Sequence, residues 1–306
     1  MKREYFSTTR NGFYGVYYEN YQYCDRGIIL MLGDKIDDLM VKIGVRWLQK
    51  NGCNVMAMAS DTKDYAYHDY PIECFEKAID ILKSKGNTKF GIIGASTTAM
   101  IALTAASFIP DITLTIALSP SDFIMEGFYR DGLDGARKRP GNNESTLTYK
   151  GKRLPYLPFA YRHPEYWKKL QEEAKRRGDM AAARDMFDLS EQICPLTEDM
   201  KIKAERIKGK LVLIGAEDDS LWDTCRYINR IIERLKITAH ECRVAKLTFE
   251  YGSHFVFPQS MLESILPFGS SVLLRLAFKT LRDHPKECKQ TRIEIDRRLR
   301  RIIQNW

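Results

Sequence analysis

Short apolar runs alternate with amphipathic stretches along most of the chain, from about residue 27 onward. A run that is apolar on both faces and bounded by turn residues is typical of a strand buried in a parallel sheet. Five runs fit this description: residues 27–32, 54–59, 90–93, 112–118 and 211–214. Amphipathic segments that predict helices cover residues 36–50, 71–85, 97–108 and 223–236. The alternation predicts an α/β fold with a mostly parallel central sheet flanked by helices.

The opening segment has a different pattern, because aromatic and polar residues alternate on either side of Asn11-Gly12. Asn-Gly is the preferred pair of a type I′ turn, so residues 4–18 are predicted to form a β-hairpin. With these two strands counted, residues 112–118 form the sixth predicted strand.

The alternation stops between residues 121 and 208, although residues 164–192 predict strongly charged helices. An insertion of this length after the sixth strand is expected over the sheet edge where α/β proteins bind ligands. We therefore expect residues 121–208 to form a lid or cap within a single domain that spans residues 1–306. A peripheral helical decoration is the alternative.

Composition restricts the class of protein, but the net charge does not identify a binding partner. Hydrophobic residues make up 44% of the 306 positions, which excludes a disordered, collagen-like or coiled-coil chain. The net charge of +8 favours anionic partners, whether nucleic acid, membrane or phosphorylated metabolite. Residues 270–306 predict two further helices, and the last is strongly basic. Apolar positions within it favour packing on the domain, or on a second subunit of a homo-oligomer, over nucleic-acid binding.

The sequence also bears on compartment and cofactors. The first residues are polar, and no stretch approaches the ~18 apolar residues of a membrane span. The seven cysteines are scattered and lack any Cys-x-x-Cys spacing, which argues against disulfides and a thiolate metal site. We therefore expect a cytoplasmic protein without a membrane span, a metal ion or a cofactor.

Ser96 is the first candidate for chemistry, within Gly94-Ala95-Ser96-Thr97-Thr98 between a predicted strand and a predicted helix. In that setting a Gly-x-Ser turn raises the serine hydroxyl above the sheet as a nucleophile. The helix N-terminus and the backbone N–H of Thr97 are then placed to stabilise an oxyanion. The second glycine usual in this motif is replaced by Thr98. A serine that only caps the helix is the alternative.

A serine nucleophile of this kind needs an acid and then a histidine further along the chain. Glu217, Asp218 and Asp219 follow the predicted strand 211–214, and His254 follows the next strand-like run. His254 is our candidate for the general base and Asp219 for the acid that orients it, with Asp218 second and Glu217 third. The alternatives are a solvated acidic loop and a buried structural histidine.

An oxyanion hole needs a second donor, from the loop that follows residues 27–32. The backbone N–H of Asp34 or of Lys35 could supply it beside Thr97. A plain helix start capped by Asp34 explains the same residues.

Together these residues resemble the C-terminal α/β-hydrolase domain shared by acyl-CoA thioesterases and bile acid-CoA:amino acid N-acyltransferase. The resemblance runs from about residue 27 to about residue 265. Its most similar stretches are Gly52–Ala59, Tyr70–Ala78, Tyr149–Pro155 and Asp218–Trp222. The resemblance implies an α/β-hydrolase fold with Ser96 as nucleophile, Asp219 as acid and His254 as base.

In that family a serine nucleophile accompanies thioester hydrolysis and a cysteine accompanies transfer to amino acids, so the resemblance implies a hydrolase. The chain departs from the family at Thr98 and at Gly33–Asp38, which replaces a glycine-rich segment. The β-sandwich domain that precedes this domain in animal enzymes has no counterpart in the residues before the first core strand. We therefore expect a stand-alone, bacterial-type member.

These inferences predict a serine hydrolase that cleaves an acyl thioester through an acyl-enzyme intermediate, with acyl-CoA as its small-molecule substrate. Basic residues of the insertion could attract the phosphates of CoA. They are Arg137, Lys138, Arg139, Lys150, Lys152 and Arg153. The alternatives are an esterase, amide hydrolase or acyltransferase that acts on a non-CoA substrate, and a non-catalytic binding protein on the hydrolase scaffold.

Overall fold

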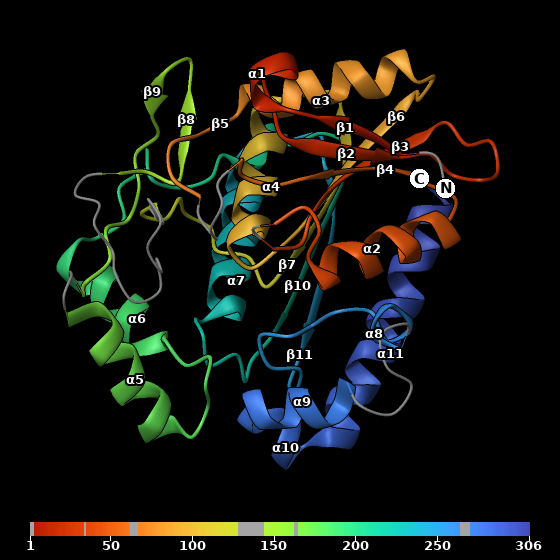
Figure 1. Ribbon diagram of the computed structural model, residues 1–306. Coiled ribbons are helices and arrows are strands. Elements are labelled where there is room, and N and C mark those ends of the chain that lie inside the picture. Colours follow the sequence, from red (N-terminus) through yellow and green to blue (C-terminus); the bar gives the residue numbers. More distant parts are fainter. Residues whose placement is uncertain (1–2, 34, 62–66, 128–143, 162–164, 264–269) are drawn as a thin grey trace.

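A mostly parallel sheet forms the centre of the computed structural model, which describes residues 3–33, 35–61, 67–127, 144–161, 165–263 and 270–306 (Figure 1). Within these residues the sheet has eight strands in the order β1-β2-β4-β3-β6-β7-β10-β11. Neighbours from β4 to β11 run parallel, and β2 is antiparallel to both β1 and β4. The strands are β1 Arg3–Phe6, β2 Gly15–Tyr18, β3 Arg26–Met31, β4 Asn54–Met58, β6 Lys89–Ala95, β7 Ile112–Leu118, β10 Lys210–Ala216 and β11 Arg243–Phe249. The predicted fold class is confirmed.

Helices cover both faces of the sheet because its central strands are apolar on both sides. Along β3, Ile28 and Leu30 pack into one core, whereas Ile29 and Met31 pack into the other. The first core is closed by α2 Leu39–Lys50, α8 Gln259–Leu262 and α11 Pro285–Gln304. The second is closed by α3 Glu73–Ser84, α4 Thr97–Phe108 and α7 Thr224–Ile237. The predicted core strands and the helices between them all exist, with ends within a few residues of those predicted.

The predicted hairpin is right in its strand pairing and wrong in its turn. β1 and β2 pair antiparallel, with Phe6 opposite Gly15. Between them, however, Thr8–Asn11 form the short helix α1 instead of a type I′ turn. Gly12 ends this helix at φ 73°, where its N–H donates to the carbonyl of Thr8. The same left-handed glycine that a type I′ turn requires therefore serves as a helix C-cap.

The C-terminal segment holds three described helices where the sequence predicted two. These are α9 Ser270–Ala277, α10 Lys279–Asp283 and α11. Helix α11 begins at Pro285. Proline is favoured in the first turn of a helix, where the N–H that it lacks would have no partner within the helix. None of the helices in the described part of the chain is both long enough and apolar enough to cross a membrane.

The insertion after β7 contains both short strands and helices in its described parts. Its strands β8 Leu147–Tyr149 and β9 Lys152–Arg153 form a second, small sheet with β5 Tyr70–Pro71. Its helices are α5 Glu165–Arg177 and α6 Arg184–Ile193, followed by the 3-10 turn η1 Ala204–Arg206. Figure 1 shows α5 and α6 in green, beside the sheet and on the same side as α7.

Candidate active site

Ser96 stands at the turn between β6 and α4, in a backbone conformation that side chains rarely adopt. Its dihedral angles are φ 60° and ψ −129°. The turn is held because Ser96 N–H donates to the carbonyl of Leu118 at 2.8 Å, across the end of β7. Gly94 permits the close approach of α4, since a Cβ there would lie 2.0 Å from the carbonyl oxygen of Thr98. The half-buried serine is therefore presented on a strained strand-to-helix elbow.

Thr98, the position of the missing glycine, stabilises this elbow through its hydroxyl. Thr98 is buried at 3% exposure. Its Oγ1 donates to the carbonyl of Met31 at 2.6 Å and accepts from the N–H of Ala95 at 3.0 Å. The hydroxyl thus joins the end of β3 to the end of β6. A glycine at this position would give the backbone more conformational freedom. Thr98 instead connects the two strands through hydrogen bonds of its hydroxyl.

His254 and Asp219 are in direct contact. Nδ1 of His254 lies 2.8 Å from Oδ2 of Asp219, whose side chain is fully buried. Oδ1 of the same carboxylate accepts from the N–H of Leu221 at 2.9 Å, and Oδ2 also accepts from the hydroxyl of Thr224. An ionised carboxylate only accepts hydrogen bonds, so the contact places the imidazole proton on Nδ1 and leaves Nε2 as an acceptor. This is the arrangement that a general base requires.

The two other carboxylates of the acidic loop lie elsewhere. Asp218 accepts from the N–H of Gly252 at 3.0 Å and from the N–H of Ser253 at 2.8 Å, immediately before the histidine. Burial raises the pKa of Asp218 above its usual range, against the opposing effect of these hydrogen bonds. Glu217 is exposed. Asp218 therefore fixes the backbone of the histidine loop, and neither residue takes the place of Asp219 against the imidazole.

The remaining nitrogen of His254 has an apolar neighbour and no hydrogen bond. Nε2 is buried and has no partner among the described residues. The ring packs edge-on against Trp222, with centroids 4.8 Å apart and planes at 87°. No hydrogen bond joins Ser96 to His254 in the part of the chain that the structure describes. The structure thus brings His254 and Asp219 together, and within the described residues neither Nε2 nor the hydroxyl of Ser96 has a hydrogen bond.

The candidate donors for an oxyanion are described only in part. Thr97 is the first residue of α4, so its backbone N–H has no acceptor within the helix. Asp34 lies outside the described residues. Its neighbour Gly33 has φ 118°, a value that favours glycine, and its carbonyl accepts from the hydroxyl of Tyr67 at 3.0 Å. Lys35 is half-buried.

Sequence reasoning missed two residues that touch the histidine. Ser119 follows β7, has φ 49°, and donates its hydroxyl to the carbonyl of His254 at 3.0 Å. Trp222 lies in a stretch similar to the family, and its ring packs against the imidazole. A polar residue directly after a buried strand was the available signal for Ser119. Its positive φ and its long-range partner have no signature in a single sequence.

The basic residues predicted to attract phosphates differ in what they contact. Arg153 is engaged with Asp69, with Nε and Nη2 at 2.8 and 2.7 Å from the two carboxylate oxygens. Lys150 and Lys152 are exposed. The other three, at positions 137–139, lie outside the described residues. Among the residues described, no group of three or more His, Cys, Asp or Glu side chains could hold a metal ion.

A groove of about 690 Å³ lies along α7, away from the elbow. Its lining includes Glu217 and Asp223 but neither Ser96 nor His254. The arginines that face it, Arg226, Arg230 and Arg234, are each paired with carboxylates. The lining of the groove therefore includes neither residue of the His254–Asp219 pair.

Comparisons with known proteins bear on the family and the fold. The chain matches the family model described as "BAAT / Acyl-CoA thioester hydrolase C terminal" over residues 70–261, well over half of its length. A comparison with curated proteins found no match.

Two solved structures to which the chain is similar differ in how closely they match. The α/β hydrolase MGS-M1, from a Medee basin deep-sea metagenome library, is 12% identical with a TM-score of 0.56, covering 100% of this chain and 99% of that one. The Pyrococcus furiosus esterase Pf2001 is 16% identical with a TM-score of 0.47, covering 89% and 85% of the two chains. At 12% identity the similarity to MGS-M1 shows a shared fold and nothing about function. With a TM-score of 0.47, the similarity to the esterase supports no conclusion.

Proposed function

The chain belongs to the BAAT / acyl-CoA thioester hydrolase C-terminal family and has the α/β-hydrolase fold, and from this premise we propose that it cleaves an acyl thioester, with acyl-CoA as substrate. Family membership supports a hydrolase; the serine nucleophile and the thioester are our proposal. The observation that carries it is the 2.8 Å contact between His254 and the buried Asp219, with Nε2 of the imidazole unpartnered among the residues that the structure describes.

In the proposed reaction the hydroxyl of Ser96 attacks the thioester carbonyl as Nε2 of His254 takes its proton. Asp219 stabilises the imidazolium that forms. The oxyanion accepts hydrogen bonds from Thr97 N–H and from a second N–H in the loop around Asp34. As the tetrahedral intermediate collapses, the thiol leaves with the proton from His254. Water, deprotonated by the same imidazole, then attacks the acyl-enzyme. As this second intermediate collapses, the bond to Ser96 breaks, the serine oxygen regains its proton from His254, and the carboxylic acid is released.

We also propose that the insertion, residues 121–208, acts as a lid or cap over the acyl group. The exposed Lys150 and Lys152 and the net charge of +8 favour a phosphorylated leaving group such as CoA. Arg153 is less available for this purpose, because Asp69 already binds its guanidinium in a bidentate pair.

An esterase, an amide hydrolase or an acyltransferase on a non-CoA substrate would use the same three residues, because the triad does not choose the leaving group. A non-catalytic protein on the same scaffold would leave Ser96 unreactive. The strained φ of 60° at Ser96 favours catalysis, since such strain is retained where the surrounding structure imposes it and it clusters at functional sites.

The test compares purified wild-type protein, Ser96→Ala and the control Ser84→Ala on a panel of acyl-CoA and aryl-ester substrates. Ser84 is a suitable control because it is exposed and its hydroxyl donates to the carbonyl of Ile81 in its own helix. We expect thiol release by wild type and Ser84→Ala, and none above background by Ser96→Ala. A higher kcat/KM on aryl esters than on every acyl-CoA would favour the esterase. If a fluorophosphonate fails to label the folded wild-type protein, a serine enzyme is excluded.

A further inference from the structure

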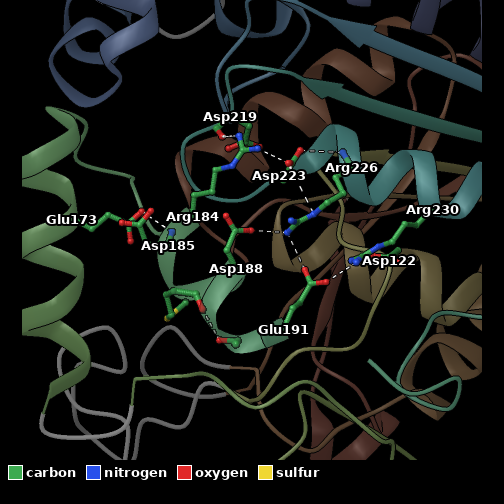
Figure 2. A network of polar contacts seen from close by, with 12 residues as sticks. Asp122, Glu173, Arg184, Asp185, Asp188, Glu191, Asp219, Asp223, Arg226 and Arg230 are labelled. Atoms are coloured by element: carbon green, nitrogen blue, oxygen red, sulfur yellow. Dashed lines mark hydrogen bonds and ion pairs between the residues drawn. The ribbon is translucent and has the colours of Figure 1, made fainter. Parts of the chain in front are cut away.

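The first turn of α6, in the insertion, contacts the loop that carries the candidate acid. The backbone N–H groups of Ala183 and Arg184 both donate to the carbonyl of Ser220, at 3.2 Å each. The guanidinium of Arg184 donates to the carbonyl of Asp219 at 3.3 Å and pairs with the carboxylate of Asp223. Figure 2 shows Arg184 reaching from α6 to these two residues. The insertion therefore contacts both ends of the acidic loop.

Asp223 connects this contact to the carboxylate of Asp219. It caps α7 by accepting from the N–H of Arg226 at 3.1 Å. The next residue, Thr224, begins α7 and donates its hydroxyl to the carboxylate of Asp219. Arg184 thus holds the residue that fixes the start of α7, and the start of α7 holds the carboxylate that orients the imidazole.

A second, apolar route leads from α6 to the imidazole. Phe187 packs edge-on against Trp222 with centroids 5.1 Å apart, and Trp222 packs edge-on against His254. Both aromatic side chains are buried, at 3% and 2% exposure. Arg184 and Phe187 lie three residues apart, on one side of α6.

We propose that Arg184 is a positioning residue for the His254–Asp219 pair, so that the insertion completes the active site in addition to covering it. This inference rests on the proposed function. Arg184 does not reach the reacting atoms; it acts by holding the backbone of Asp219 and the start of α7. A displacement of about 1 Å at a catalytic group can cost about 100-fold in rate, so a loosened loop is expected to slow the chemical step.

The docking of α6 does not depend on Arg184 alone. Along the same helix pair, Arg226 contacts Asp188 at 2.6 Å and Glu191 at 3.0 Å, and Arg230 contacts Glu191 at 2.5 Å (Figure 2). Removal of the Arg184 side chain is therefore expected to leave α6 in place and the protein folded. A change in rate then reports on the acidic loop.

The test compares Arg184→Ala and Arg184→Lys with a matched control, Arg176→Ala. Arg176 lies in the same insertion and pairs with Asp185 of α6, but its side chain is 60% exposed, and within the described residues no hydrogen bond or ion pair joins it to the acidic loop. We expect Arg184→Ala to lower kcat for an acyl-CoA roughly 10- to 100-fold with KM changed less than about twofold. Arg184→Lys should recover part of the rate, and Arg176→Ala should match wild type.

A second readout does not depend on activity. The Nδ1 proton of His254, hydrogen-bonded to a buried carboxylate, should give a downfield proton resonance that is lost in His254→Gln. We expect the signal in wild type and Arg176→Ala, and its broadening or loss in Arg184→Ala.

Three results would overturn the inference: an unchanged kcat and resonance in Arg184→Ala, an equal loss in Arg176→Ala, or a higher KM at unchanged kcat. If wild type neither releases thiol nor reacts with a fluorophosphonate, the proposed function fails. The resonance then still decides whether Arg184 positions the pair.

Discussion

Three serines around the candidate site have positive φ: 60° at Ser96, 49° at Ser119 and 56° at Ser253. Such backbone costs about 1–3 kcal/mol at each non-glycine residue and persists only where the surroundings impose it. Here hydrogen bonds impose it, from Ser96 N–H to Leu118, from Ser119 N–H to Ile214 and from Ser253 N–H to Asp218. The strained residues therefore lie at the elbow itself and beside His254.

The strain at Ser96 can be measured with two inactive variants. Glycine adopts positive φ without steric cost, so Ser96→Gly should be more stable than Ser96→Ala by about 1 kcal/mol, despite glycine's larger entropy in the unfolded chain. Urea unfolding of both variants measures the difference. An Ala variant at least as stable as the Gly variant would show that the elbow is not strained.

Two substitutions at Asp218 test how much its hydrogen bonds contribute to stability. Asp218→Ala leaves two buried N–H groups, of Gly252 and Ser253, without an acceptor and should cost about 1–3 kcal/mol. Asp218→Asn keeps an oxygen acceptor and should cost less.

The pH dependence follows from burial, which raises the pKa of Asp218 in the folded state, so that folding disfavours the ionised carboxyl. The wild type's stability relative to Asp218→Asn should therefore be greatest below the unfolded pKa of about 3.9 and decline as pH rises through the folded pKa. Urea unfolding of both proteins between about pH 3 and pH 7 checks the sign, and the opposite trend would contradict it.

At this scale the sequence predicted which residues lie near one another better than their hydrogen-bond partners. Ser96 and Asp219 each follow a buried strand, β6 or β10, and His254 follows the edge strand β11, which is why all three could be named from the chain alone. The distinct positions of Asp218 and Asp219 could not be predicted, because both are carboxylates in one loop and differ only in long-range partners. Thr98 could be read only as a departure from a motif, since its bond to Met31 joins strands distant in sequence.

At the scale of elements, α6 and α7 are joined by a row of ion pairs that uses the arginine face of α7. Arg230 contacts Glu191 at 2.5 Å and Asp122 at 2.6 Å, and Asp122 is only 4% exposed. The sequence predicted charged helices over residues 164–192 without showing which partners their charges have. In the structure Asp188 and Glu191 of α6 form ion pairs with Arg226 and Arg230 of α7.

The turn after β1 was mispredicted because Gly12 suits either a type I′ turn or a helix C-cap.

Removal of Arg230 should therefore be costly. Arg230→Ala leaves the buried Asp122 without its cation and is expected to lower the free energy of unfolding by about 3–5 kcal/mol. Arg230→Met combined with Asp122→Leu should recover most of that loss, since an apolar pair avoids the uncompensated charge. Thermal and urea unfolding of the single and double variants test this, and additive losses would contradict it.

At the scale of the whole molecule, the net charge of +8 is a long-range field, and many of its sources are paired locally. On α11, Glu294 contacts Arg297 at 2.7 Å and Arg298 at 2.6 Å, and these arginines lower its pKa to about 2. The apolar side of α11 is buried against the domain through Ile295 and Leu299. The basic C-terminal helix therefore has a structural use within this chain.

If the remaining field attracts an anionic substrate, its effect should depend on salt. Raising ionic strength from about 0.02 M to about 0.5 M shortens the Debye length several-fold, so kcat/KM for an acyl-CoA should fall. For a neutral aryl ester it should stay nearly constant. Equal salt dependence for both substrates would mean that the charge has no part in substrate capture.

The most direct test of the account is to trap the acyl-enzyme. Wild-type protein is mixed with an acyl-CoA, quenched in acid and digested. Mass spectrometry gives the mass of the peptide that contains Ser96, and the amount of free CoA thiol is measured in parallel. If Ser96 is the nucleophile, the peptide is heavier by one acyl group on Ser96 and thiol is released, and neither occurs in Ser96→Ala. Thiol release by Ser96→Ala at the wild-type rate, or an acyl group on another residue, would contradict it.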